Sequence, residues 1–179
     1  MAKIELRQLP RLPRGAYQGL AMVHWIYSMN HRETGWLDEV FHLRFRELSC
    51  HVLGRYGCVV PAYCLMPDHM HLLCMGISDT SDQYLMNKML RQELAKTLEP
   101  VAMERQPYDN VLREGERKRR VFEGTANYVL ENPVRRELVE DWKAYPFSGC
   151  LVPGYFDLDP RKEGYWELFW RIRQKLVRE

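Results

Sequence analysis

The chain has 179 residues, of which 46% are hydrophobic and 28% are charged. This composition is ordinary for a globular protein, and the length allows one domain to bury a core without disulfides or metal ions as staples. The net charge of only +2 gives no global basic field that would by itself indicate nucleic-acid binding.

The cysteines and the lack of long apolar runs indicate the cellular compartment in which the protein is expected. The five cysteines are odd in number and form no Cys-x-x-Cys pair, which favours reduced, buried thiols over a disulfide framework or a zinc knuckle. Residues 1–14 lack the apolar stretch of a signal peptide, and no segment approaches the length of a membrane span. We therefore expect a cytoplasmic protein without a membrane partner.

The spacing of apolar residues predicts eight regular elements. They are a strand over residues 16–29, a helix over 37–56, a hairpin of strands over 58–66 and from 69 onward, a helix from 81 that is interrupted near 100, a short strand over 108–112, a helix over 114–132 and a final helix over about 162–177. This order predicts an α+β fold with a ferredoxin-like antiparallel sheet and helices packed on it. We expect residues 1–179 to form one domain with a C-terminal basic amphipathic helix.

A pair of histidines follows the tight turn predicted at Pro67 and Asp68. Because side chains alternate along a strand, His69 and His71 are expected to point to one side and Met70 to the other. Two imidazoles one pleat repeat apart can converge on one ion at bond lengths of ~2.1 Å. His-x-His is a short pattern, however, and a pair of half-exposed histidines on a sheet surface is the alternative.

A second polar cluster lies near the end of the helix predicted over residues 114–132. Tyr128 and Asn132 are four residues apart and share a face at the edge of the apolar stripe. Pro133 disfavours helical geometry at the preceding residue, so the helix is expected to bend or end near Asn132. An amide and a phenol would then lie together at a helix end. The alternative is an ordinary Asn-Pro helix stop beside a tyrosine that only packs.

Cationic residues gather in three places along the chain. Each run alone is more often a solvated helix face than a binding surface, yet together they are candidates for contact with backbone phosphates. The candidates are Arg117, Lys118, Arg119, Arg120, Arg135, Arg171, Lys175 and Arg178. The aromatic residues Tyr165, Trp166 and Phe169 could stack on unpaired bases, although packing of the last helix is another use for them.

The two polar clusters together resemble a known family. The segment from Pro67 to His71 (Pro-Asp-His-Met-His), combined with the segment from Tyr128 to Arg135 (Tyr-Val-Leu-Glu-Asn-Pro-Val-Arg), resembles the single-tyrosine HUH transposases. Within this superfamily, the REP-associated tyrosine transposases are the most similar branch. Residues 142–148 (Trp-Lys-Ala-Tyr-Pro-Phe-Ser) are similar to that branch's tryptophan-tyrosine-proline-serine segment.

The resemblance implies a fold, a site and a reaction. The histidine strand would be central in a ferredoxin-like sheet, and the tyrosine would lie on a helix packed against it. His69, His71 and Asn132 would hold a divalent metal, magnesium or manganese, and Tyr128 would be the nucleophile. The implied reaction is cleavage and rejoining of single-stranded DNA at or near a hairpin through a 5′-phosphotyrosine intermediate. The partner would be such a hairpin, bound by a monomer or a homodimer.

Elementary chemistry agrees with this assignment but leaves three hypotheses. Imidazole and amide ligands without thiolates suit manganese or magnesium, and such an ion polarises a phosphate. A phenol, with a pKa of ~10, needs a nearby cation to become a nucleophile. The leading hypothesis is therefore a DNA transesterase. The others are a domesticated hairpin-binding protein that rarely or never cuts, and a metal phosphodiesterase in which water attacks.

Overall fold

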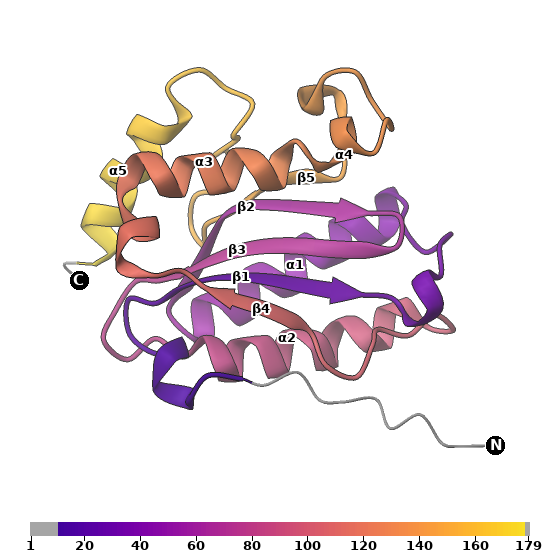
Figure 1. Cartoon of the computed structure of the whole chain (residues 1–179), viewed down its shortest axis with the longest axis horizontal. Coiled ribbons are helices and arrows are strands. Elements are labelled where there is room, and N and C mark those ends of the chain that lie inside the picture. The colour runs from indigo at the N-terminus through magenta and orange to yellow at the C-terminus, as the bar shows by residue number, and fades with distance from the viewer. Residues whose placement is uncertain (1–10, 178–179) are drawn as a thin grey trace.

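An antiparallel sheet forms the middle layer of the structure, a computed structural model that describes residues 11–177. The strands are β1 (Met22–Ser28), β2 (Cys58–Met66), β3 (His69–Gly76), β4 (Tyr108–Val111) and β5 (Ser148–Leu151). They lie in the order β4-β1-β3-β2-β5, so that β3 is central (Figure 1). The first four strands and the intervening helices follow the β-α-β-β-α-β order of a ferredoxin-like fold. The predicted α+β class with a central histidine strand is confirmed.

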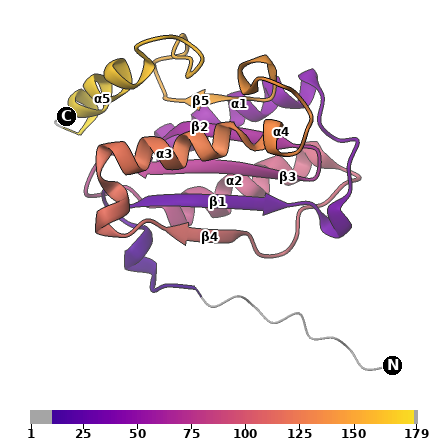
Figure 2. The ribbon, with the colours of Figure 1, turned by 45° about the horizontal axis from the view of Figure 1, so that its top comes forward.

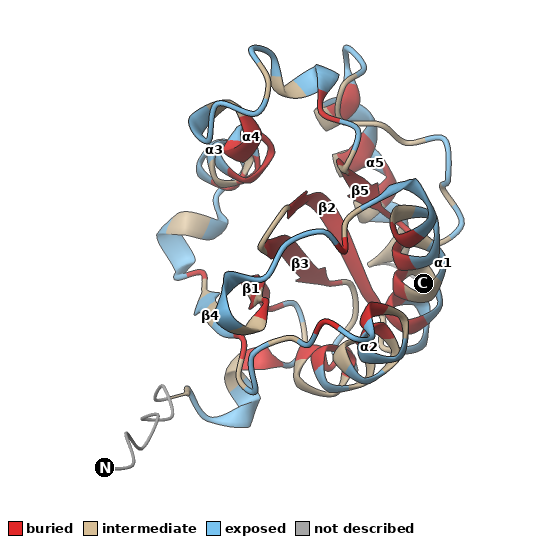
Figure 3. Ribbon diagram, turned by 90° about the vertical axis from the view of Figure 1, so that its right-hand side faces the viewer, coloured by how far each residue is buried: buried red, intermediate tan, exposed pale blue. Residues whose placement is uncertain are grey.

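Helices cover both faces of the sheet. Two of them, α1 (Glu39–Arg55) and α2 (Gln83–Leu98), lie on one face, and α3 (Arg119–Leu130) and α5 (Tyr165–Leu176) lie on the other (Figures 1 and 3). A short helix, α4 (Asn132–Arg135), follows α3 after a break at Glu131. Figure 2 shows α4 at the end of the sheet where β2 turns into β3.

Strand alternation divides the interior into two cores. Along β1, Trp25 and Tyr27 face α1 and α2, whereas Met22 belongs to the core under α3 and α5. Every residue of β2 and β3 is buried, because helices cover both faces of these strands. Met70 lies in the core under α1 and α2, so the face of β3 that carries the two histidines is the α3 face.

Predicted boundaries differ from the structure where short turns replace regular elements. β1 begins at Met22 and not at residue 16, because Arg14–Tyr17 forms a 3-10 turn. The helix predicted over residues 114–132 is divided into the 3-10 turn Glu114–Arg117, α3 and α4, since Lys118 has an extended backbone. β5 has no counterpart among the predicted elements, because its four residues are too few for a periodic signal.

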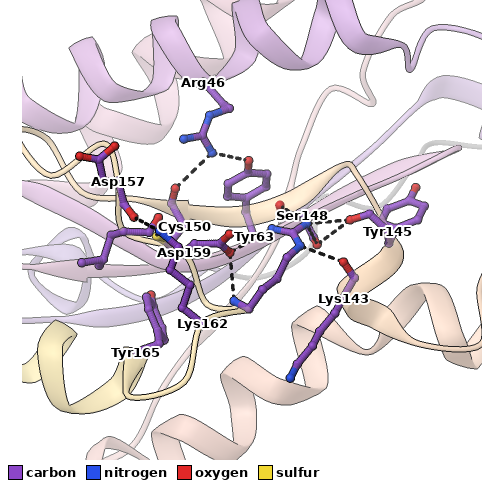
Figure 4. A network of polar contacts seen from close by, with 12 residues as sticks. Arg46, Tyr63, Lys143, Tyr145, Ser148, Cys150, Asp157, Asp159, Lys162 and Tyr165 are labelled. Atoms are coloured by element: carbon purple, nitrogen blue, oxygen red, sulfur yellow. Dashed lines mark hydrogen bonds and ion pairs between the residues drawn. The ribbon is translucent and has the colours of Figure 1, made fainter.

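Arg161 fastens the segment between α4 and β5. Its guanidinium donates hydrogen bonds to the carbonyl oxygens of Lys143 (3.0 Å), Tyr145 (2.7 Å) and Ser148 (2.9 Å) and pairs with Asp159 at 3.1 Å. Figure 4 shows Lys143, Tyr145, Ser148 and Asp159 gathered around this network. One side chain thus satisfies three backbone acceptors that would otherwise need water.

Three general expectations can be compared with the described residues. All five cysteines are free and four of them are buried, as predicted. Within residues 11–177, no helix has the length and apolar character needed to span a membrane. The single domain over residues 1–179 remains a prediction, because the first ten and last two residues lie outside the described part.

Candidate active site

The two histidines of β3 converge on one point. Both side chains are 6% exposed, and their Nε2 atoms are 2.9 Å apart. The rings meet nearly edge to face, with an interplanar angle of 78°. The predicted orientation of His69 and His71 to one face is therefore confirmed, and the alternative of two half-exposed surface histidines is wrong.

Each histidine is held from behind through its other ring nitrogen. The Nδ1 atom of His69 lies 2.6 Å from Oδ1 of Asp68, and the Nδ1 atom of His71 lies 3.0 Å from Nε2 of His24 on β1. When both Nε2 lone pairs face one ion, both ring protons lie on Nδ1, where Asp68 and His24 can accept them. A backing acceptor of this kind fixes the tautomer and orientation of a metal-ligating imidazole.

Electrostatics keep the imidazoles neutral. Burial is the main cause that lowers the pKa of His71 to about 2, and neighbouring His24, His69 and Arg135 lower it further. Burial also lowers the pKa of His24 to about 4. The pKa of His69 is lowered by burial despite the opposing effect of the Asp68 carboxylate. A metal ligand must be unprotonated, and these rings meet that condition at neutral pH.

The geometry of the pair fits a divalent cation. Two ligand atoms at about 2.1 Å from one ion and at right angles to each other are about 3.0 Å apart. The observed Nε2 separation of 2.9 Å matches this spacing. Among residues 11–177, no three His, Cys, Asp or Glu side chains form such a site by themselves. A third protein ligand would therefore be of another type, such as the amide oxygen of Asn132.

Asp68 offers a test of the histidine arrangement that leaves both candidate ligands in place. In Asp68→Asn, the amide oxygen can still accept a hydrogen bond from His69, but the negative charge that raises the basicity of the ring is lost. We expect the affinity for Mn²⁺ to fall about tenfold or more, measured by calorimetric titration. Asp79→Asn, which removes an exposed carboxylate outside the site, should leave the affinity unchanged. Equal affinities for the two variants would contradict the proposed role of Asp68.

Tyr128 lies on the exposed side of α3, near its end. Its side chain is 53% exposed, and the guanidinium of Arg135 stacks on the ring at 3.9 Å from the centroid. Arg135 also donates a hydrogen bond to the Tyr128 carbonyl oxygen and pairs with Glu131 at 3.5 Å. A guanidinium on the ring face attracts the π-system electrostatically and so helps to hold the ring in place.

Asn132 is buried at the helix break, with 8% of its surface exposed. Its Nδ2 donates to the carbonyl oxygens of Tyr128 at 3.2 Å and Val129 at 3.0 Å. The amide nitrogen therefore satisfies acceptors at the end of α3, and the carbonyl oxygen accepts no hydrogen bond from the described residues. Such an oxygen is available as a metal ligand.

The end of α3 packs beside the histidine strand. Val129 and Leu130 share a core with Met66, the residue of β2 that is paired with His69. After burial and Arg32, the charge of Arg136, which caps the C-terminus of α4, is a further cause that lowers the pKa of His69. Arg135 of α4 likewise lowers the pKa of His71. Tyr128, Asn132 and the histidines thus belong to one end of the molecule.

The predicted phosphate-binding cations do not form one patch. Arg135 accompanies Tyr128, but Arg117, Lys118, Arg119 and Arg120 lie at the start of α3, about 15 Å from Tyr128 along the helix axis. Two of these side chains have structural partners: Arg117 donates to the Leu112 carbonyl oxygen, and Arg119 pairs with Glu123 at 2.8 Å. Lys118 and Arg120 are exposed.

The cations of the last helix occupy its outer side. Arg171 and Lys175 are exposed, whereas Arg178 lies outside the described residues. The stacking candidates Tyr165 and Phe169 are 4% and 1% exposed, so they pack α5 onto the sheet instead of offering ring faces to bases. The buried residues of α5 are Tyr165, Phe169 and Ile172.

Three residues of the site lie outside the predicted set. His24 and Asp68 back the two histidines, and the exposed Arg136 directly follows α4. Asp68 could be recognised from the sequence only if His69 is already taken to be a metal ligand, because an aspartate in a turn is otherwise common. His24 could not be found, because the sequence does not give the pairing of β1 with β3.

Comparison with known families decides the assignment for part of the chain. The sequence model of "Transposase IS200 like" proteins matches residues 18–101, which include β1, α1, the histidine hairpin and α2. Residues 18–101 are therefore similar to this family. The resemblance to single-tyrosine transposases is thereby confirmed, and the match ends before α3, which carries Tyr128. A search of curated proteins finds no match to the chain.

Solved structures extend the likeness in fold beyond the IS200-like segment. A REP-associated tyrosine transposase bound to a REP hairpin matches with a TM-score of 0.65, covers 80% of this chain and 82% of that chain, and has 15% sequence identity. This similarity shows a shared fold. A candidate transposase from Deinococcus radiodurans R1 matches with a TM-score of 0.44 over 66% of this chain and 97% of that chain, with 17% identity.

Proposed function

We propose that this protein is a transposase-like, metal-dependent, single-stranded DNA transesterase that cleaves at or near a hairpin through a 5′-phosphotyrosine bond. One observation carries the proposal: two neutral imidazoles converge at 2.9 Å, each backed through its other nitrogen, at the sheet end where α3 brings Tyr128 and Asn132. The hairpin as partner is supported by the solved structure of similar fold, which is bound to a REP hairpin.

His69 and His71, together with the carbonyl oxygen of Asn132, would hold the divalent ion. When bound there, magnesium or manganese supplies positive charge to the scissile phosphate and to the departing oxygen. Asn132 has a second task, because its amide nitrogen fixes the carbonyl oxygens that end α3 and so sets the direction of the helix carrying Tyr128.

Tyr128 would attack the phosphorus atom with its phenolic oxygen. The new bond joins this oxygen to the 5′ phosphate, the bond between phosphorus and the 3′ oxygen breaks, and the released oxygen takes up a proton to become a 3′ hydroxyl. Arg135, which stacks on the ring, would hold the phenol in position as the reaction begins. The phosphotyrosine bond conserves the energy of the phosphodiester, so a 3′ hydroxyl can reverse the step and form a new junction.

A covalent-adduct assay tests the proposal directly. The protein is incubated with labelled single-stranded hairpins and Mg²⁺ or Mn²⁺, denatured, and separated by size. A labelled band at the mass of protein plus DNA is the expected result. Cleavage without such a band would favour attack by water, and hairpin binding without cleavage would favour the domesticated binding protein. Because each site has one nucleophile, excision with rejoining would need two protomers or two sequential rounds.

Contacts with phosphates should make hairpin binding sensitive to salt. In Arg171→Glu/Lys175→Glu, loss of two phosphate contacts should reduce the slope of log affinity against log salt by about 1.5, measured by fluorescence anisotropy between low and moderate salt. A matched control is Arg44→Glu/Lys96→Glu, which changes two other exposed cations on α1 and α2 by the same charge. The same slope in both variants would remove α5 from the proposed DNA interface.

A further inference from the structure

A cavity of about 920 Å³ lies between α2 and the loop that follows it, on the side of the sheet away from Tyr128. Asn87, Lys88 and Arg91 line it from the helix, and residues 99–106 line it from the loop. Its volume is in the upper part of the range of about 300–1,000 Å³ typical of small-molecule sites. The site formed by the histidines and Tyr128 uses none of these residues.

Three side chains that line the cavity, those of Arg11, Asn87 and Arg91, have a buried polar atom without a hydrogen-bond partner. Asn87 is 4% exposed, and its Oδ1 has no hydrogen bond among the described residues. The Nε of Arg91 is also buried and unpaired, although its terminal nitrogens donate to the carbonyl oxygens of Glu104 and, at 3.0 Å, Arg105. A buried acceptor or donor without a partner is costly, so these atoms point to a ligand that offers both.

The charge and the apolar surface of the cavity indicate which class of ligand it would bind. Four cationic residues and one acidic residue, Glu99, line it, so the balance of charge favours an anion; the cations are Arg11, Lys88, Arg91 and Arg105. The wall also includes the ring of Tyr84 and several apolar side chains. Cations, hydrogen-bonding groups and an aromatic ring beside each other suit a nucleotide, with its phosphate, its base edge and its flat base.

The loop that lines the cavity is connected to the histidine site. The carbonyl oxygen of Ala102 accepts a hydrogen bond from the backbone of Asn30 at 2.8 Å, and Met103 pairs with Met29. The backbone of Met29 in turn donates to the carbonyl oxygen of Asp68 at 3.0 Å, next to His69. The cavity therefore meets the sheet at the end that carries the histidine pair. A single strand that leaves this pair could pass around that end, beside the exposed Arg32, which pairs with Asp68.

We propose that the α2 cavity binds unpaired nucleotides of the DNA strand that flanks the hairpin. Lys88 and Arg105 bind the phosphates, and the Oδ1 of Asn87 accepts a hydrogen bond from a base. This inference rests on the proposed function, because it takes single-stranded DNA as the substrate. The α2 cavity would be a second DNA-binding site, on the face of the sheet opposite Tyr128, and it would recognise the base sequence beside the hairpin.

Binding to two substrates separates this site from general attraction to DNA. Fluorescence anisotropy compares a bare hairpin with the same hairpin carrying an unpaired flank on one side or the other. Lys88→Glu/Arg105→Glu should weaken binding of one flanked hairpin about tenfold or more and change binding of the bare hairpin less than about twofold. The control Arg44→Glu/Lys96→Glu should affect all substrates equally and slightly. Equal weakening for flanked and bare hairpins, or no weakening for either, overturns the inference.

Asn87→Leu tests base recognition in the same cavity. It keeps a side chain of similar size but removes the acceptor, so the affinity differences among flanks of changed sequence should shrink to less than about twofold. If these differences persist, Asn87 does not read a base. Free deoxynucleoside monophosphates should not displace the flanked hairpin at micromolar concentration; displacement would identify a free nucleotide as the ligand and overturn the proposal. An adduct that forms equally with flanked and bare hairpins leaves the transesterase intact while the cavity proposal fails.

Discussion

Replacing Tyr128 with phenylalanine should abolish the covalent protein–DNA band. The change removes only the hydroxyl, and the ring remains under the guanidinium of Arg135 at the surface of α3. Folding and hairpin affinity should therefore be retained. Loss of the nucleophile removes the chemical step itself, so adduct formation should fall by roughly three orders of magnitude or more. The measurement is the denaturant-resistant band at a fixed time with saturating hairpin.

Tyr108 provides a matched control for this experiment. It is exposed to nearly the same degree as Tyr128, 52% against 53%, and lies on the edge strand β4. Tyr108→Phe should give the wild-type band. A band that persists in Tyr128→Phe would show that another group attacks the phosphorus. Cleavage that continues in this variant without any band would instead assign the attack to water.

Replacing both His69 and His71 with alanine should eliminate cleavage that depends on manganese or magnesium. The cation contributes several kcal/mol of stabilisation to charge that develops on the phosphate, so a loss of roughly three orders of magnitude in rate is expected. Binding of Mn²⁺ at the site should disappear in a calorimetric titration. Hairpin binding should remain, because the proposed phosphate contacts lie on other elements.

The control for the histidine pair is His51→Ala, which removes an exposed imidazole on α1. Far-UV circular dichroism checks the fold, because both β3 histidines are buried and alanine leaves space behind. Should the alanine variant not fold, His69→Gln/His71→Gln fills the space with weaker ligands and serves the same comparison. Normal cleavage by a folded double variant would rule out the histidines as metal ligands.

Much of the fold could be predicted, because elements with a regular pattern of burial also have a regular spacing of apolar residues in the sequence. Residues 58–66 form β2 with both predicted bounds, since a strand buried on both faces reads as one apolar run. The apolar stripe of α3 is buried in the structure, at Phe122, Ala126, Val129 and Leu130. β5 could not be predicted, because a four-residue strand depends on the neighbour it pairs with.

The site could be predicted in part because two of its signals are local. Alternation along β3 gives the common direction of His69 and His71, and the proline after Asn132 gives the helix break. His24 carries no such signal, since its contact with His71 depends on the register between β1 and β3. The contact of the basic residues with phosphates stays a prediction, because charge runs show where cations occur along the chain, not whether Arg117 or Arg119 already has a partner.

The pairing of β5 has a consequence for attempts to shorten the protein. β2 is buried along its whole length, and β5 covers the edge that faces away from β3. A chain cut after α4 would contain the histidines, Tyr128 and Asn132, yet it would present the unpaired backbone groups of an apolar strand to solvent. Such an edge is a template for pairing with another chain, so the shortened protein should self-associate. The residues that carry out the chemistry and the residues that keep the molecule apart from its copies are therefore different parts of one sequence.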